Sequence, residues 1–165
     1  MSVQLRRSVV ALTILTLATV TARGQSTATP QGAAGERVAT AADSNGIRDA
    51  AMDYIQGWYE GNAVRMERAL HPELAKRIVR TDPKTGHSAF SSMSALTLIN
   101  GVKAGGGTNT PATHRRTDYR LLDIYENAAV ARVDAGDWVD YLQLAKWNGR
   151  WVIVNVLWEL RPQTP

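Results

Sequence analysis

The sequence predicts an α+β domain in which a curved antiparallel sheet packs on one face against helices that precede it. Two observations lead to this prediction. In the first half of the folded region, apolar residues recur at the three- and four-residue spacing of one helical face. After Pro111 the pattern changes to four runs rich in β-branched and aromatic residues, each bounded by turn residues. Helices that precede a single sheet in this way pack together on one of its faces.

The composition allows one domain and excludes several kinds of site. The chain has 165 residues, of which 44% are hydrophobic and 21% charged, as in ordinary globular domains. It contains no cysteine, which excludes disulfides, thiolate nucleophiles and iron–sulfur clusters. The formal net charge is +4, and basic residues are interleaved with acidic ones instead of forming a basic stripe. We therefore expect no nucleic-acid partner.

Residues 1–22 have the layout of a secretory signal peptide. A basic start ends at Arg6–Arg7, an apolar stretch covers residues 9–20, and cleavage is expected after Ala22. The apolar stretch is shorter than the ~20 residues that span a bilayer, so we expect no stable membrane insertion after cleavage. The alternative is that this segment is not cleaved and remains as a membrane anchor. Residues 23–45 lack aromatic side chains, which predicts a flexible tether. The protein is expected to be exported, either to a periplasm or out of the cell.

The folded domain is predicted to span residues 46–161, with a short tail at 162–165. Its first helix ends at Gly61, and it has one apolar face and three candidate N-caps. The face consists of Ile47, Ala50, Ala51, Tyr54, Ile55 and Trp58, and the candidate caps are Asp43, Ser44 and Asn45. Asn62 is expected to cap a short second helix, which stops before Pro72. Ser94 is expected to cap a third, which ends at a hinge formed by glycines 105–107.

Four strands are predicted to follow the helices. They cover residues 117–125, 128–134, 138–147 and 150–160. Asn148–Gly149 predicts a two-residue hairpin turn between the last two, because both residues tolerate positive φ. A shorter strand is expected at residues 76–80, followed by a turn-rich loop at 81–87. The last strand is apolar on both of its faces, so its second face needs a cover, and a homodimer partner would provide one.

Short motifs spread over residues 47–161 carry a family resemblance. They are Asp53-Tyr54-Ile55, Gly57-Trp58-Tyr59, Leu70-His71-Pro72-Glu73-Leu74, Lys76-Arg77, Asp82-Pro83-Lys84-Thr85-Gly86, Gly105-Gly106-Gly107, Gly136-Asp137-Trp138, Asp140-Tyr141-Leu142 and the run from Trp151 to Trp158. With the order of elements, these motifs resemble the nuclear transport factor 2-like superfamily, and within it the putative lumazine-binding family. The resemblance implies a cone of curved sheet closed by helices, with a small-molecule pocket between them. Superfamily members include ketosteroid isomerases, dehydratases and proteins without catalysis.

Five residues are candidate ligand-binding residues. Tyr54 and Trp58 project from the first helix toward the sheet, where a planar heteroaromatic ligand could stack on them; a plain core role is the alternative. Trp138 and Asp140 share one face of a strand, and Asn155 is assigned to the face that carries Trp151, Ile153 and Leu157. A polar group among apolar neighbours either bonds within the protein or faces a cavity, since burying it unsatisfied costs about 1–3 kcal/mol.

Two residues are candidate general bases. Asp140 is one, because of its apolar neighbours. His71 is the other, at the end of the second helix, where capping the last carbonyls is the alternative role. Asp53 is expected to be exposed. The three histidines are scattered along the chain, so we expect no metal site, and no motif indicates a cofactor.

Three functions remain open at this point. The first is an exported homodimer whose cone binds a small apolar or heteroaromatic molecule. The second is an enzyme of the ketosteroid isomerase or dehydratase type, with Asp140 or His71 as general base. In that enzyme, Tyr54 or Asn155 would polarise a substrate carbonyl. The third is a non-catalytic protein-interaction domain whose cone is filled by its own side chains, so a cavity would favour the first two.

Overall fold

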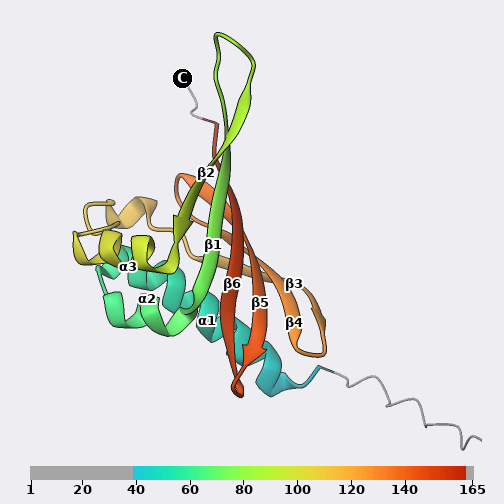
Figure 1. Ribbon diagram of the computed structural model, residues 1–165. Helices are drawn as coiled ribbons and strands as arrows, with labels where there is room; N and C mark the ends of the chain where they lie inside the picture. Colours follow the sequence, from blue (N-terminus) through green and yellow to red (C-terminus); the bar gives the residue numbers. More distant parts are fainter. Residues whose placement is uncertain (1–38, 163–165) are drawn as a thin grey trace, which may run out of the picture. The chain divides into compact units, whose positions relative to one another are not determined.

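The computed structural model describes residues 39–162, which form three α-helices, one short 3-10 helix and six strands (Figure 1). The helices are α1 (Ala41–Glu60), α2 (Ala63–Ala69), α3 (Ala95–Lys103) and η1 (Ala112–His114). The strands are β1 (Leu70–Thr81), β2 (Ser88–Ser94), β3 (Asp118–Tyr125), β4 (Ala128–Asp134), β5 (Trp138–Trp147) and β6 (Arg150–Leu160). The predicted signal peptide and most of the predicted tether lie outside the described residues. None of the described helices is long and apolar enough to span a membrane.

The six strands form one sheet in the order β2-β1-β6-β5-β4-β3. All neighbours are antiparallel except β1 and β6, which run parallel. Strands β3 to β6 form the predicted meander, and the bounds of β4, β5 and β6 agree with the prediction. Strand β1 is longer than the predicted strand at residues 76–80. Strand β2 was not predicted, because its serine-rich sequence contains no β-branched residue.

The three α-helices gather on one side of the sheet (Figure 1), as the α+β prediction requires. Their apolar faces and the inner face of the sheet form one hydrophobic core. Fully buried members of this core include Ile47 and Ile55 of α1, Met66 of α2, Val102 of α3, Val133 of β4 and Leu142 of β5. Asn62 and Ser94 cap α2 and α3 as predicted, each accepting a hydrogen bond from a backbone N–H three residues later. Local sequence signals therefore set these two helix starts.

Helix α1 begins at Ala41, five residues before the predicted domain boundary. Its N-cap is Thr40, and none of the three predicted caps holds that position. The Thr40 hydroxyl accepts from the Asp43 N–H at 3.1 Å, and the Asp43 carboxylate accepts from the Thr40 N–H at 3.2 Å. This reciprocal pair is a capping box. Asp43 also accepts hydrogen bonds from Lys146 at 2.7 Å and Trp151 at 3.1 Å, which attach the start of α1 to β5 and β6.

These contacts predict that Asp43 makes the fold sensitive to acid. Hydrogen bonds from Lys146, then from Thr40 and Trp151, hold the pKa of the Asp43 carboxyl well below its usual value. Because the folded-state pKa is lowered, the stability that this carboxylate adds is present above about pH 4 and is lost as the pH falls further. Asp43→Asn is expected to lower Tm at neutral pH, and the difference from wild type should shrink below about pH 4.

Thermal denaturation followed by circular dichroism at several pH values measures this effect. Asp49→Asn is the matched control, since Asp49 is an exposed carboxylate on the same helix. A difference in Tm between wild type and Asp43→Asn that does not change with pH would contradict the prediction.

A β-bulge changes which residues of β6 face the helices. Gln143 of β5 pairs with Asn155, but the next residue, Leu144, pairs with Ile153, so Val154 is an extra residue. The bulge shifts the inside–outside alternation by one position. Ile153 and Val156 therefore both reach the core, whereas Asn155 lies on the outer face of the sheet. The prediction that Asn155 shares a face with Ile153 is wrong for this reason.

Candidate functional site

A cavity of about 290 Å³ lies between the inner face of the sheet and the helices. Its wall is almost entirely apolar and is assembled from several elements. The lining includes Tyr54 and Trp58 of α1, Lys76 of β1, Leu98 of α3, Trp138 of β5 and Trp158 of β6. We term it the cone cavity. Its position is the one that the family resemblance implied for a small-molecule pocket.

A buried polar cluster lies at the cone cavity. Asp140 is 0% exposed, and its Oδ1 forms an ion pair with Lys76 Nζ. Its Oδ2 accepts hydrogen bonds from the Tyr54 hydroxyl at 3.1 Å and from Trp138 Nε1 at 2.7 Å. Lys76 Nζ also donates to the Tyr54 hydroxyl oxygen at 2.6 Å. These four residues form the floor cluster; three of them line the cone cavity, and Asp140 lies behind that wall.

The hydrogen bonds and the ion pair of the floor cluster offset the free-energy cost of burying two charges. Removing a lone ammonium or carboxylate from water costs several kcal/mol, so a buried pair needs both an opposite charge and further hydrogen bonds. Burial lowers the pKa of Lys76, although the adjacent Asp140 carboxylate acts in the opposite direction. Burial, together with the Asp140 charge, raises the pKa of Tyr54 well above its usual value. The Tyr54 hydroxyl therefore remains protonated and donates to Asp140.

Three indole rings border the space beside Lys76. Trp58 and Trp138 meet edge to face, with 6.4 Å between their ring centroids. The Lys76 ammonium lies 4.7 Å from the ring centroid of Trp158. Gly107, predicted as part of a hinge, packs against Trp58 so closely that a Cβ atom would lie 2.4 Å from the indole ring. The glycines after α3 therefore allow the chain to approach Trp58.

The structure brings together four of the five predicted ligand-binding residues. Tyr54, Trp58 and Trp138 line the cone cavity, and Asp140 lies directly behind its wall. Asn155 is on the opposite face of the sheet, where its side chain contacts two neighbouring strands. It accepts from Arg77 at 3.0 Å and donates to Gln143 at 3.1 Å. The β-bulge explains why it points away from the other four.

His71 lies outside the cone cavity. It is the second residue of β1, and its Nδ1 accepts a hydrogen bond from the Glu73 N–H at 3.2 Å. Its ring packs edge-on against Trp147, with 4.9 Å between centroids. His71 therefore does not belong to α2, whose last helical residue is Ala69, and it does not line the cavity beside which the candidate base Asp140 lies.

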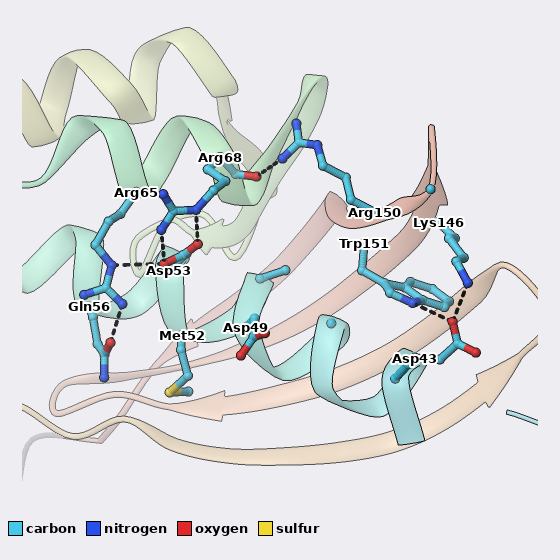
Figure 2. A pocket seen from close by; sticks show the side chains of 14 residues that line it. Asp43, Asp49, Met52, Asp53, Gln56, Arg65, Arg68, Lys146, Arg150 and Trp151 are labelled. Atoms are coloured by element: carbon cyan, nitrogen blue, oxygen red, sulfur yellow. Dashed lines mark hydrogen bonds and ion pairs between the residues drawn. The ribbon is translucent and has the colours of Figure 1, made fainter. Parts of the chain in front are cut away.

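A second hollow, of about 680 Å³, runs along α1 between α2 and the turn of the β5–β6 hairpin (Figure 2). Five of its charged side chains pair with one another, and Arg150 donates to the backbone carbonyl of Arg68. Asp53 is not exposed as predicted: its side chain is 14% exposed and forms ion pairs with Arg65 at 3.0 Å and Arg68 at 2.6 Å. Asp43 pairs with Lys146 at the other end. A charged ligand would have to displace these partners, so the cone cavity is the stronger candidate site.

Lys76 is the site residue that sequence reasoning missed. It was noted only as part of a family motif, within a strand predicted to be short. In β1 the buried residues alternate as Leu74, Lys76 and Ile78, so Lys76 occupies a core position. A lysine in phase with two apolar core residues of a strand is the signal that could have identified it.

The floor cluster can polarise an oxygen atom more readily than it can remove a proton. Lys76 brings an ammonium to an apolar cavity, where a hydrogen bond to a substrate oxygen is strong, whereas the Tyr54 proton is already donated to Asp140. The two Asp140 oxygens already accept from three side chains, so Asp140 would have to release a donor before acting as a base. In residues 39–162, no group of histidine and carboxylate side chains is arranged to hold a metal ion.

Solved structures with the same architecture define the class of fold. An NTF2-like (nuclear transport factor 2-like) protein of unknown function from Shewanella baltica OS155 has a TM-score of 0.58 and 17% identity, covering 77% of this chain and 100% of that one. Another from Methylobacillus flagellatus KT has a TM-score of 0.59 and 24% identity, covering 78% and 100%. A protein of unknown function with a cystatin-like fold from Nostoc punctiforme PCC 73102 has a TM-score of 0.52 and 16% identity, covering 76% and 96%. The fold is therefore nuclear transport factor 2-like, as the resemblance implied.

The sequence also matches one particular family within this class of fold. Residues 42–159 match the family described as "Putative lumazine-binding". The chain belongs to this family. None of the curated proteins matches the chain significantly.

Proposed function

We propose that the protein is an exported binding protein whose cone cavity holds a small apolar or heteroaromatic molecule. The cavity itself is the observation that supports this most strongly. Its volume of about 290 Å³ lies just below the range of small-molecule sites, roughly 300–1,000 Å³, and so suits a small ligand. The family description supports the same class of ligand, because lumazine is a small, planar heteroaromatic compound.

The walls of the cavity suit such a ligand. Trp58, Trp138 and Trp158 provide aromatic surfaces, on which a planar ring gains both burial and stacking. The floor cluster adds a small number of polar groups at one place in an otherwise apolar wall, an arrangement that orients a ligand in a binding site. A protein-interaction domain with a filled cone would not need this space.

Export and dimerisation complete the proposal. Export is supported by the layout of residues 1–22, which resembles a signal peptide. Dimerisation is supported by apolar side chains on the outer face of the sheet, where Val79, Tyr141 and Leu157 are 42%, 43% and 49% exposed. The same face of a second copy would cover them.

Native mass spectrometry of residues 23–165, purified gently from the protein's own host, tests the proposal. We expect a dimer that carries a reproducible additional small-molecule mass. Met93→Trp should abolish that mass, since Met93 lines the cavity and the larger side chain would occupy it. Phe90→Trp is the matched control, because Phe90 is exposed on the opposite face of the same strand.

Three results would contradict parts of this proposal. A wild-type protein without additional mass would contradict tight ligand binding, and the same mass on Met93→Trp would place the ligand outside the cone cavity. A monomer would contradict the dimer.

The floor cluster also supports a second function, an enzyme of the ketosteroid isomerase or dehydratase type. Lys76 would polarise a substrate carbonyl in the cavity, and Tyr54 would join it by turning its hydroxyl away from Asp140. Loss of that donor would leave Asp140 more able to act as the general base. In such an enzyme, Asp140→Asn is expected to abolish turnover even at a temperature where circular dichroism shows that this less stable variant is folded. Unchanged turnover in this variant would exclude Asp140 from the mechanism.

A further inference from the structure

We infer that the molecule held in the cone cavity presents a hydrogen-bond acceptor, a carbonyl or carboxylate oxygen, to Lys76. The inference rests on the proposed function and adds the chemical class of the ligand. Three observations support it. One N–H of Lys76 has no acceptor, the Lys76 ammonium lies closer to the cavity than the Asp140 carboxylate does, and the indole N–H of Trp158 also has no acceptor.

Lys76 has one N–H available for a ligand. A lysine ammonium has three N–H donors and no acceptor. One donates to the Tyr54 hydroxyl oxygen and another to Asp140 Oδ1. The third has no hydrogen-bond acceptor among the described residues, although Lys76 lines the cone cavity and is only 4% exposed. The ammonium also lies 4.7 Å from the Trp158 ring centroid, a cation–π contact that leaves this N–H without an oxygen acceptor. An acceptor atom on a bound molecule would give this third N–H a hydrogen-bond partner.

The acceptors of the floor cluster are already occupied. Both Asp140 oxygens receive hydrogen bonds, Oδ1 from Lys76 and Oδ2 from Tyr54 and Trp138. The Tyr54 oxygen accepts from Lys76 while its own proton is donated to Asp140. The floor cluster therefore offers a donor to the cavity, and a ligand group that can only donate would find no free carboxylate oxygen there.

The arrangement of charge favours the same class of ligand. The ammonium of Lys76 is on the cavity wall, whereas the Asp140 carboxylate lies behind it, so the positive member of the pair is nearer to a ligand. Among the described residues, Asp137 is the carboxylate that lines the cavity, and it immediately precedes β5. In the strand register Lys76 is level with Leu142, further along β5, so Asp137 lies near a different part of the wall. A hydrogen bond between an ammonium and an anionic oxygen is stronger than one between neutral groups.

Trp158 provides an independent indication. Its indole N–H is buried and has no acceptor among the residues that the structure describes, although its ring lines the same cavity. A buried donor without a partner is costly. Lys76 and Trp158 thus each have a donor without an acceptor, and both residues line one cavity. The Trp158 N–H is covered by protein atoms, so a shift of its side chain is needed before a ligand oxygen can reach it.

Two fluorescent probes that differ in one acceptor group test the inference. 1-Anilinonaphthalene-8-sulfonate carries a sulfonate, and N-phenyl-1-naphthylamine has the same rings without it. The variant Lys76→Met/Asp140→Asn removes both buried charges together, and the amide oxygen that Asp140→Asn introduces can still accept from Tyr54 and Trp138. We expect this variant to bind the sulfonate probe about tenfold more weakly than wild type, with less than about a twofold change for the neutral probe.

A competition on the wild-type protein tests the same inference without depending on the fold of a variant. 2-Naphthoate and 2-naphthylmethylamine have the same ring system but carry a carboxylate and an ammonium, respectively. We expect 2-naphthoate to displace N-phenyl-1-naphthylamine at about a tenfold lower concentration. Equal potency of the two competitors, or equal losses of both probes in the double variant, would overturn the inference.

A failure of the proposed function would have a different signature. If Met93→Trp binds both probes as tightly as wild type, the probes do not occupy the cone cavity, and both proposals fail. If Met93→Trp loses both probes and Phe90→Trp retains them, the cavity binds small molecules. The competition and the double variant then decide the acceptor preference alone.

Discussion

Replacing Lys76 by methionine is expected to lower the free energy of unfolding by about 3–5 kcal/mol. The substitution removes the ion partner of Asp140, which is 0% exposed, so a carboxylate would remain buried with hydrogen bonds but without an opposite charge. Asp140→Asn should also destabilise the fold, because it leaves the Lys76 ammonium buried beside a neutral amide. The double variant should lose much less than the sum of the two single losses, since no uncompensated charge remains.

Urea denaturation of wild type, both single variants and the double variant measures this coupling. Arg116→Met is a suitable control. Arg116 and Asp118 form an ion pair at 2.6 Å, but their side chains are 50% and 65% exposed. Its loss should cost less than about 1 kcal/mol. Single losses that add up to the loss of the double variant would contradict the assigned role of the Lys76–Asp140 pair.

Gly136→Ala is expected to destabilise the fold by about 3 kcal/mol. A Cβ atom at this position would lie 2.2 Å from the backbone carbonyl oxygen of His114. Relief of that clash requires the backbone to move, and the Gly136 N–H also donates to the Tyr59 hydroxyl at 3.2 Å. The residue immediately precedes the Asp137–Trp138 segment of the cavity wall, so the shift would reach the cone cavity.

The same substitution at Gly101 is the control. A Cβ atom there would lie 3.8 Å from the Trp58 ring, an ordinary contact. Gly101 is inside α3, where alanine is the better helix former, so Gly101→Ala should stabilise the fold by about 0.5–1 kcal/mol. Denaturation curves that place Gly136→Ala at wild-type stability would contradict the close packing of Gly136 against residue 114.

Where the signals are local, the sequence predicts the fold well. The caps Asn62 and Ser94 each bond a backbone N–H within one helical turn. The turn at Asn148–Gly149 has φ values of 49° and 82°, the positive values that its two residue types tolerate. Periodicity, caps and turns of this kind depend only on neighbours in the chain. The helix positions and the four-stranded meander follow from them.

Pairing between strands that are distant in sequence cannot be predicted from such local signals. The parallel register of β1 with β6, which places Lys76 opposite Val156, depends on residues 80 positions apart in sequence and leaves no local pattern. The extra residue Val154 likewise cannot be recognised in an apolar run, although it changes the face on which Asn155 lies. Errors in the predicted sheet therefore come from its tertiary pairing and from one bulge.

Local patterns likewise predicted individual residues of the candidate site but not their contacts with one another. Tyr54 and Trp58 could be placed from the helical period of α1, and Trp138 and Asp140 from the alternation of one strand. Their arrangement into a cluster could not be predicted, because the partners of Asp140 come from α1, β1 and β5. Lys76 was missed because a lysine is expected at the surface unless a buried partner is known.

The five tryptophans of the chain provide the most direct test of the cone cavity as a binding site. Trp58, Trp138 and Trp158 line it, whereas Trp147 and Trp151 do not. In ¹H–¹⁵N spectra of the wild-type protein, N-phenyl-1-naphthylamine is expected to shift the indole N–H signals of the three cavity tryptophans and to leave the other two unchanged. Shifts confined to Trp147 and Trp151, or no shift at saturating probe, would contradict ligand binding in the cone cavity.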